Sequence, residues 1–466
     1  MARGDRPPGA WGPGFQELSS RREQQAGAAG GGAAGAAGGG AAGTGRATKA
    51  ADGGAGGTGF CTAEAAGSLT FVQTQYRMGR PARAASARRP LMVRRPSWVV
   101  DPFLIAGSIA AATIGVVMVY TATRGPLLLA GTSPTYYLKR QAIFVVLGIA
   151  VMGAVGFFDY RKLEAFGMAI YALSVLVLLA VMVPHVGSHS PLGSARWFNL
   201  GPIQIQPSEF AVLGLVIAVA TYCARRPEGL TWLDVVKVLV MGAVPTSLVM
   251  VQPDLGTGII MSVVLFVMLS VAGLPTRVLI VLIVGAVAMV ALVLGAGILH
   301  HYQILRITSF LHQSTAHPTG TLAGAVYNLQ QAKDAIGAGG LFGTGIGHGA
   351  ATNLGYVPEQ QTDFIFTAVG EQLGFVGAVG VLALLFFLAW RVLRVGQLAR
   401  DDFGRLVCVG VFAFVAFSTF QNAGMTMGIM PITGIPLPFI SYGGTAVIAF
   451  FVGIGLGLSV YARRGG

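Results

Sequence analysis

Charged residues are scarce in this chain of 466 residues, because Asp, Glu, Lys and Arg together make up only 11% of it. A soluble domain usually carries about 25% charged residues. The pattern of alternating apolar residues that marks a membrane β-barrel is also missing. Apolar residues instead make up 54% of the chain and recur in long runs. Since about twenty apolar residues are needed to cross a bilayer as a helix, the sequence indicates a polytopic helical membrane protein.

Cysteine, acidic residues and nucleotide-binding motifs are also in short supply. The three cysteines, Cys61, Cys223 and Cys408, show no paired spacing, which argues against a disulfide framework or a zinc site. The 31 Lys and Arg outnumber the 18 Asp and Glu, giving a net charge of +13. Without a recognition fold or a basic stripe with interleaved aromatics, this excess indicates membrane topology and anionic lipid, and no nucleic acid. Without a nucleotide fingerprint, any group transfer has to draw on an activated substrate.

Residues 1–97 are predicted to be a disordered, basic cytoplasmic tail, followed by a membrane domain over 98–466. The stretch from Ala26 to Gly57 is so rich in Gly and Ala that it cannot bury enough surface to fold. No short apolar run with a cleavage site marks a signal peptide. Seven arginines precede the first long apolar run, and clusters of this kind normally stay cytoplasmic: Arg77, Arg80, Arg83, Arg88, Arg89, Arg94 and Arg95.

The apolar runs predict an all-α fold of about ten transmembrane helices. They lie at 102–122, 141–158, 164–183, 208–224, 233–252, 255–273, 278–299, 364–390, 405–428 and 438–462. With a cytoplasmic N-terminus, the inner loops hold twelve Lys and Arg and the outer loops six, as the positive-inside rule requires. An even number of spans returns the C-terminus to the cytoplasm. A large extracytoplasmic loop, about residues 300–363, then lies between spans 7 and 8.

Polar chemistry is concentrated on the predicted outer side. All seven histidines lie there, together with six carboxylates: Glu209, Asp254, Asp334, Glu359, Asp363 and Glu371. The stretch Tyr356–Phe366 carries Glu359 and Asp363 directly into an apolar helix. A carboxylate at the junction of water and hydrocarbon is partly desolvated, which raises its pKa and suits it to act as a base. Taken alone, the local sequence favours the simpler interpretation, in which Asp363 caps the helix that follows it.

Four other outer motifs have both a functional and a structural interpretation. Arg196 is a fixed cation able to grip a phosphate, whereas Trp197 suits the membrane interface and Pro207-Ser-Glu209 a helix start. Asp254 follows Gln252 in a turn so short that it must lie near the bilayer, as a functional acid or a helix cap. The glycines between Gly337 and Gly349 could cradle phosphate oxygens or only give flexibility. His185 and His189 have the spacing of metal ligands, but the neighbouring prolines favour a loop.

Six motifs follow one another in a fixed order. They are Tyr137-Leu-Lys-Arg-Gln141; Ala195-Arg-Trp-Phe-Asn-Leu-Gly201 with Gln206-Pro-Ser-Glu-Phe210; Gln252-Pro-Asp-Leu-Gly-Thr257; Pro358-Glu-Gln-Gln-Thr-Asp-Phe-Ile-Phe366; Gly370-Glu-Gln-Leu-Gly-Phe375; and Thr433-Gly-Ile-Pro-Leu-Pro-Phe-Ile-Ser-Tyr-Gly-Gly444. Together they resemble the SEDS family (shape, elongation, division and sporulation), and the Thr-Gly-Ile-Pro-Leu-Pro wording favours its RodA type over FtsW. The resemblance covers about residues 98–462.

The resemblance implies a peptidoglycan glycosyltransferase that polymerises lipid II at the outer face of the bacterial cytoplasmic membrane during elongation and rod-shape maintenance. Its implied partners are lipid II, a class B penicillin-binding protein, other elongation-complex membrane proteins and membrane lipids. Asp363 matches the family's essential aspartate and would deprotonate the acceptor hydroxyl. The resemblance implies no definite cofactor. A divalent cation, Mg²⁺ or Mn²⁺, could share the pyrophosphate charge, and the metal ligands are left unassigned.

The matching motifs, together with Arg306 and Lys333 of the predicted outer loop, supply two sets of further site residues. The substrate-binding candidates are Lys139, Arg140, Arg196, Trp197, Glu209, Arg306, Lys333, Glu359, Glu371 and Ser441. The supporting candidates are Gln252, Asp254, Pro436, Pro438, Gly443 and Gly444. The two prolines and paired glycines predict irregular backbone at membrane depth, which is tolerated where it is buried or lines a cavity.

One departure from the family pattern concerns Val212, which stands where the family usually has a lysine. That lysine is expected to pair with the aspartate that is Asp254 here. Its loss predicts that Asp254 is protonated or paired with another cation, because an unpaired charge near the membrane is costly.

Three alternatives remain open from the sequence. A lipid II flippase or other transporter would place polar residues at mid-bilayer, whereas the acids here crowd the outer side. A division-type, FtsW-like synthase differs from the RodA type in few residues. A scaffold that only recruits its partner synthase would not need Asp363.

Overall fold

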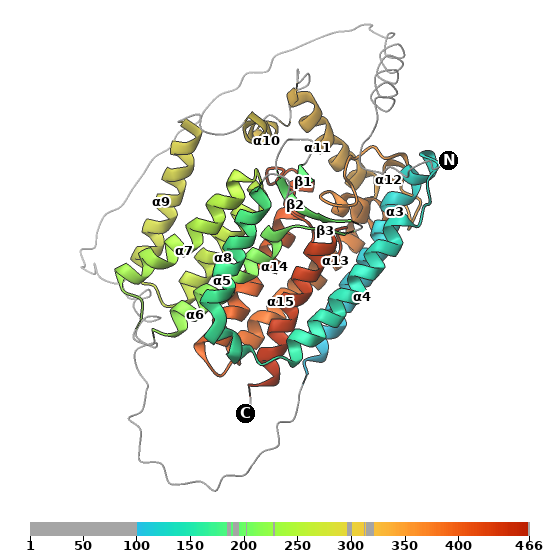
Figure 1. Ribbon diagram of the computed structural model, residues 1–466. Coiled ribbons are helices and arrows are strands. Elements are labelled where there is room, and N and C mark those ends of the chain that lie inside the picture. The colour runs from blue at the N-terminus through green and yellow to red at the C-terminus, as the bar shows by residue number, and fades with distance from the viewer. Residues whose placement is uncertain are drawn as a thin grey trace, which may run out of the picture. The chain divides into compact units, whose positions relative to one another are not determined.

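The computed structural model describes residues 100–183, 188–189, 195–201, 203–226, 229–295, 301–311, 313 and 321–464. The predicted tail over 1–97 lies outside these residues, and so does His185. Helices occur at all ten predicted membrane segments (Figure 1): α3 (Pro102–Leu129), α4 (Tyr136–Phe157), α5 (Tyr160–Met182), α6 (Pro207–Ala224), α7 (Trp232–Val251), α8 (Leu255–Val271), α9 (Thr276–Gly295), α13 (Ile365–Gln397), α14 (Asp402–Thr426) and α15 (Gly444–Ala462).

Eight of these helices are long and apolar enough to cross a membrane, and the other two contribute the shorter apolar stretches Leu255–Val271 and Thr276–Ala286. The predicted outer loop contains α10 (His301–Leu311), α11 (Thr321–Ala338) and α12 (Ala350–Leu354). Before α6 lie three short antiparallel strands in sequence order, β1 (Ser188–His189), β2 (Ala195–Leu200) and β3 (Ile203–Ile205). The predicted helical architecture is therefore confirmed, with a small sheet before α6 that the apolar runs did not indicate.

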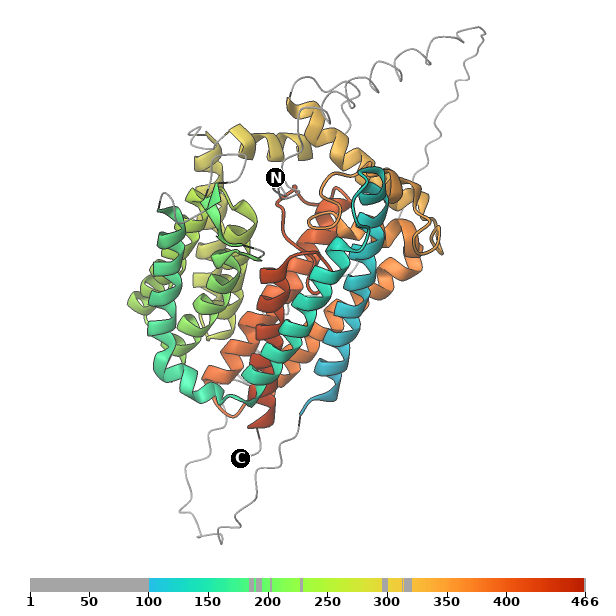
Figure 2. The same cartoon turned by 45° about the vertical axis from the view of Figure 1, so that its right-hand side comes forward.

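The most buried helices of the bundle are α6, α14 and α15. Glycines allow neighbouring helices to pack closely. A Cβ added at Gly455 of α15 would lie 2.8 Å from the Met152 carbonyl oxygen of α4, which is too close for a side chain. The helix α6 begins with Pro207 in its first turn and Glu209 near the positive end of its dipole, as predicted. The described chain starts and ends at the same end of the bundle, whereas α10, α11 and α12 lie at the opposite end (Figure 2). We call the latter the loop end.

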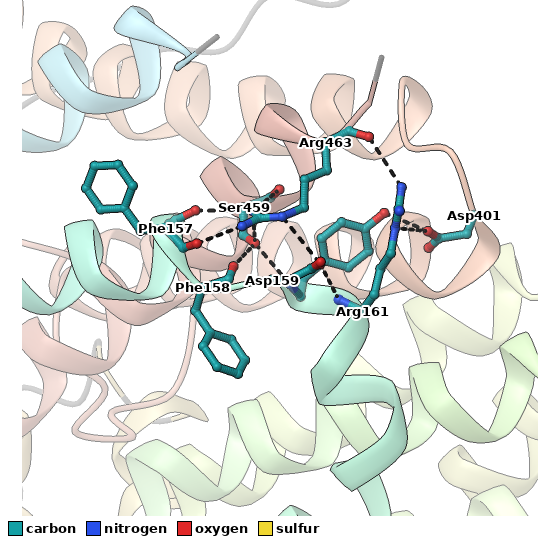
Figure 3. A network of polar contacts seen from close by, with 9 residues as sticks. Phe157, Phe158, Asp159, Arg161, Asp401, Ser459 and Arg463 are labelled. Atoms are coloured by element: carbon teal, nitrogen blue, oxygen red, sulfur yellow. Dashed lines mark hydrogen bonds and ion pairs between the residues drawn. The ribbon is translucent and has the colours of Figure 1, made fainter. Parts of the chain in front are cut away.

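The end opposite the loop end is closed by a network of polar contacts (Figure 3). Arg463, one residue beyond α15, donates to the carbonyl oxygen of Phe157 at 2.7 Å and pairs with Asp159 at 3.3 Å. Ser459 accepts a bond from the Tyr160 N–H at 3.1 Å, and the Tyr160 hydroxyl donates to Asp401 at 2.6 Å. Arg463 thereby satisfies a backbone carbonyl that has no helical partner at the end of α4. These contacts connect α4, α5, α14 and α15 at this end of the bundle.

The helix α13 is broken at Gly374, whose φ of 67° and ψ of −168° are not helical. The break leaves backbone groups without helical partners, and the segment Gly340–Gly345 satisfies them. The Phe375 and Val376 amides donate to the carbonyls of Gly340 and Leu341 at 2.9 and 3.1 Å. Such pairing is what irregular backbone near hydrocarbon requires.

The glycine run therefore has a structural task that the sequence did not reveal. In the opposite direction, the amides of Thr344 and Gly345 donate to the carbonyls of Glu371 and Gln372 at 2.9 and 3.1 Å. The Gly347 amide donates to the Gln372 side chain at 2.9 Å. Because these three N–H groups already have protein partners, they are not available to cradle phosphate oxygens.

The predicted helix ends needed correction where proline and glycine interrupt the apolar runs. The last span was predicted from residue 438, but α15 begins at Gly444, and Pro431–Leu437 has no regular secondary structure. Proline lacks an amide hydrogen and cannot continue a helix ladder. The irregular backbone predicted around Pro436 and Pro438 is therefore present, and it is largely buried.

Candidate active site

The Asp363 side chain lies at the loop end, two residues before the first residue of α13. The residue in the N-cap position is Phe364, and no side chain caps this helix. A Cβ added at Gly434 would lie 3.1 Å from Asp363 Oδ2 and 4.0 Å from Arg306 Nη2. The carboxylate thus faces the segment Pro431–Ile435 and the Arg306 guanidinium, and it does not serve as the helix cap that the sequence left open.

Burial raises the pKa of Asp363 from its usual 3.8 to about 6. The side chain is half-buried, so its charged form loses part of its hydration. The nearby charge of Glu359 raises the pKa further, whereas the Arg306 guanidinium lowers it. A carboxylate with this pKa is mostly ionised at neutral pH and is still basic enough to accept a proton.

Arg306 and Lys333 approach the same region from α10 and α11 of the predicted outer loop. On α10, Arg306 donates to the Thr433 carbonyl oxygen at 3.0 Å. On α11, Lys333 donates to the Gln313 side-chain oxygen, and Gln313 donates in turn to the Gly428 carbonyl at 2.9 Å. Two predicted cations are therefore held along residues 428–434, and Gly434 in this segment lies beside the Asp363 carboxylate.

Arg196 reaches the turn between α7 and α8, which also contains Asp254. Arg196 donates to the carbonyl oxygen of Pro253. Asp254 caps α8 by accepting from the Thr257 amide at 3.2 Å, which confirms that it acts as a cap. It is also an electrostatic neighbour of Asp363. The first residues of α6 approach this turn as well, since Glu209 is buried and has Asp254 and Asp363 as electrostatic neighbours.

Val212 leaves Asp254 without the lysine that the family pattern supplies, and neutral donors take that place. Gln206 and Ser208 donate to the Asp254 carboxylate at 2.9 and 3.1 Å, and the Thr257 hydroxyl donates at 2.9 Å. Val212 itself is completely buried in the apolar core. Hydrogen bonds to the charged form of a carboxylate can stabilise it without a cation. Among the described residues, Asp254 forms no ion pair, so its expected cationic partner is absent there.

The Tyr137–Gln141 motif adjoins the Asp363 loop through Tyr442. The rings of Tyr137 and Tyr442 are 4.8 Å apart at 89°, and the Tyr442 amide donates to the Gln361 carbonyl at 2.8 Å. Arg140 lies over the Tyr136 ring, 4.6 Å from its centroid. Arg140 is thus close to the site, whereas Lys139 is exposed beside it.

Two predicted substrate-binding residues are occupied by structural contacts. Glu371 is 1% exposed and accepts from the Ala351 amide at 2.8 Å and from the Thr352 amide and hydroxyl at 3.0 and 2.6 Å. It thereby holds the start of α12. Ser441 is also buried and accepts from the Leu437 amide at 2.8 Å. Both contacts favour supporting roles over direct binding.

The remaining candidates are spread around the site. Glu359 is exposed in the Asp363 loop with a left-handed φ of 49°, and Trp197 is half-buried on β2. Gln252 is buried and donates to the Leu178 carbonyl at 2.9 Å, and a Cβ at Gly444 would lie 2.6 Å from the Phe144 ring. Pro436, Pro438 and Gly443 lie in the irregular segment before α15.

Two buried amides on α14, Gln421 and Asn422, were missed in the sequence. Asn422 donates to the carbonyl oxygens of Asp363 and Ile435, and Gln421 donates to the carbonyl of Pro431 and the hydroxyl of Thr433. The available signal was a Gln-Asn pair inside an apolar run, where polar groups are costly and often functional.

No group of three His, Cys, Asp or Glu able to hold a metal ion occurs among the described residues. A cavity of about 460 Å³ lies between α5 and α6, lined by Met168, Thr221, Tyr222, Arg225 and Arg226. None of the predicted site residues lines it.

Several known proteins are similar to this chain in sequence. The model of the cell cycle protein family FtsW/RodA/SpoVE matches residues 103–464. The chain is 34% identical over 368 residues to stage V sporulation protein E of Bacillus subtilis, covering 78% of this chain and 98% of that protein. It is 35% identical to the peptidoglycan glycosyltransferase MrdB of Escherichia coli K12, covering 70% of this chain and 86% of MrdB.

Solved structures share the fold. A chain from a peptidoglycan synthase complex, described as coordinating polymerization and crosslinking, superposes with a TM-score of 0.65 at 30% identity, covering 79% of this chain and 99% of that one. The rod shape determining protein RodA of Thermus thermophilus superposes with a TM-score of 0.59 at 29% identity, covering 80% and 100%.

Proposed function

Because this chain belongs to the FtsW/RodA/SpoVE family of cell cycle proteins, we propose that it is a peptidoglycan glycosyltransferase. It is a multi-pass membrane protein, and its substrate is lipid II, the polyprenyl-pyrophosphate-linked disaccharide peptide. The single observation that carries the chemistry is the half-buried Asp363 carboxylate, which lies beside Arg306. Its pKa is raised to about 6.

In the proposed reaction, Asp363 accepts the proton of the acceptor sugar hydroxyl as its oxygen attacks the anomeric carbon of the donor. The new glycosidic C–O bond forms while the bond from that carbon to the pyrophosphate oxygen breaks. Lipid pyrophosphate leaves with the bonding electrons, and the proton then passes from Asp363 to solvent. A single carboxylate as base fits this displacement and differs from the paired carboxylates of glycosidases.

The developing pyrophosphate charge is stabilised by cations around Asp363. Arg306 and Lys333 lie along residues 428–434, Arg196 lies at the Asp254 turn, and Arg140 lies beside Tyr442. A guanidinium group can donate two parallel hydrogen bonds to phosphate oxygens. Fixed cations lower the activation barrier most where negative charge develops in the transition state. A divalent cation would add to the same charge, but no step here depends on it.

The partner is a class B penicillin-binding protein, with other elongation-complex membrane proteins around it. This is supported by the similarity to a chain of a peptidoglycan synthase complex. We place both termini, with residues 1–97 as a tail, on the cytoplasmic side and the loop end on the outer side, as the distribution of Lys and Arg suggests. An elongation role is favoured by the wording of the Thr433–Gly444 motif, although relatives named for sporulation and division have similar identity.

The test is lipid II polymerisation by the purified protein, with and without its cognate penicillin-binding protein, beside Asp363→Asn. Polymer from the wild type and none from the variant is the expected result, because asparagine cannot accept the proton. Asp334→Asn is the matched control, since Asp334 is an exposed aspartate on α11 and should leave the rate unchanged. Equal polymer from Asp363→Asn would remove this residue from the reaction, and no polymer from any protein would favour transport or scaffolding.

A further inference from the structure

One buried amide joins the Asp363 loop to the segment Pro431–Ile435. Asn422 of α14 is 0% exposed, and its Nδ2 donates to the carbonyl oxygen of Asp363 at 2.8 Å and to that of Ile435 at 2.7 Å. Since both partners are carbonyls, only the NH₂ group can face them, which fixes the orientation of the amide. Among the described residues, the Asn422 Oδ1 has no hydrogen-bond partner. The side chain is thus oriented entirely by the two carbonyls that it joins.

These two bonds connect the Asp363 main chain to the segment that holds its electrostatic partner. Arg306 donates to the Thr433 carbonyl at 3.0 Å, and Gly434 lies beside both the Asp363 carboxylate and the Arg306 guanidinium. Asn422 grips the same segment at Ile435. The separation of Asp363 from Arg306 is therefore set by one short path of hydrogen bonds through Asn422, residues 433–435 and Arg306.

We propose that Asn422 is a positioning residue that holds the Asp363 carboxylate against Arg306 in the geometry needed for proton transfer. The proposal rests on the glycosyltransferase function above. A base displaced by about 1 Å loses on the order of 100-fold in rate. Removing Asn422 lets the two segments separate, which weakens the influence of Arg306 on Asp363 while the carboxylate stays half-buried.

The neighbouring amide contacts the same segment but not Asp363, which makes it a matched control. Gln421 lies on the same helix, is 1% exposed, and donates to the Pro431 carbonyl at 3.0 Å and the Thr433 hydroxyl at 3.1 Å. It has no bond to Asp363. Removing Gln421 should therefore cost similar packing and hydrogen bonding without releasing Asp363.

The experiment compares wild type, Asn422→Ala and Gln421→Ala as full-length proteins with the partner synthase, following initial rates of lipid II polymerisation from about pH 5 to 8.5. For Asn422→Ala we expect kcat to fall on the order of 10- to 100-fold with KM within about threefold. The pH at which the rate falls to half on the acid side (the midpoint) should rise by about half a pH unit or more. The reason is that Arg306, which lowers the pKa of Asp363, is then further away. Gln421→Ala should keep the wild-type midpoint.

A second variant covers the case in which Asn422→Ala does not fold. Asn422→Ser keeps a hydroxyl that can donate one of the two bonds, so its kcat and midpoint should lie between those of the wild type and alanine. A wild-type midpoint in the alanine or serine variant, or a loss of kcat equal to that of Gln421→Ala, would overturn the proposal. A wild type that makes no polymer would instead overturn the glycosyltransferase function itself.

Discussion

Replacing Asp363 by asparagine should stabilise the protein while abolishing polymerisation. The carboxyl has a pKa of about 6 in the folded protein and 3.8 normally, so ionising it costs folding free energy. At about 1.36 kcal/mol per pH unit, the difference amounts to about 3 kcal/mol. This cost is absent below pH 3.8, grows as pH rises towards about 6, and is constant above that value. Asparagine removes the charge and keeps the shape, so the gain should appear in full at about pH 7.5.

The assay is the free energy of unfolding of detergent-solubilised wild type and Asp363→Asn at several pH values. The two curves should converge towards pH 4 and separate by about 3 kcal/mol at neutral pH. The Asp334→Asn control should stay within about 0.5 kcal/mol of wild type, since surface substitutions usually do. In the same preparations, wild-type polymerisation should fall as pH drops through about 6, because the base becomes protonated. If Asp363→Asn were no more stable than wild type at neutral pH, the claim that the Asp363 carboxylate is desolvated in the folded protein would be refuted.

Three further substitutions test the scaffold. Asp101→Ala should cost about 3 kcal/mol in unfolding free energy, because the completely buried Asp101 caps α3 and pairs with Arg391 at 2.8 Å, leaving that arginine unpaired. Gly374→Ala should lower the thermal midpoint sharply, because its φ of 67° and a backbone nitrogen 2.2 Å from the added Cβ leave no room for a side chain. Val212→Lys should destabilise by about 2 kcal/mol without raising the polymerisation rate, since Asp254 already has neutral donors; a faster variant would show that the lysine is needed.

The sequence was informative wherever hydrocarbon limits the choice of backbone. A chain that crosses a bilayer has to satisfy every amide internally, so runs of about twenty apolar residues could be interpreted directly as helices. Asp363 was a candidate for a similar reason, because its position at the end of a polar loop and the start of an apolar helix implies partial desolvation. The resemblance to the family was needed to prefer a base over a helix cap. The irregular stretch before α15 was predicted from Pro436 and Pro438, although its end at Gly444 was not.

Contacts between distant segments could not be predicted in the same way. Arg306 meets the Thr433 carbonyl across 127 residues, and Asn422 meets that of Asp363 across 59 residues. The break at Gly374 depends on amide partners near Gly340, so a glycine that looked like one of many acquires its role only there. Local patterns carry no information about which loop will lie against which helix.

The sequence by itself determined that the chain forms a helical membrane protein with its acids gathered at one end, because hydrophobicity and charge act locally along each span. Only the tertiary structure decided how those acids behave. It supplied Asp254 with hydrogen bonds in place of a lysine, committed Glu371 to α12, and left Asp363 half-buried against Arg306. The physical reason is that the energy of a carboxylate depends on the solvent, donors and charges within a few ångströms of it, and these are brought together by packing.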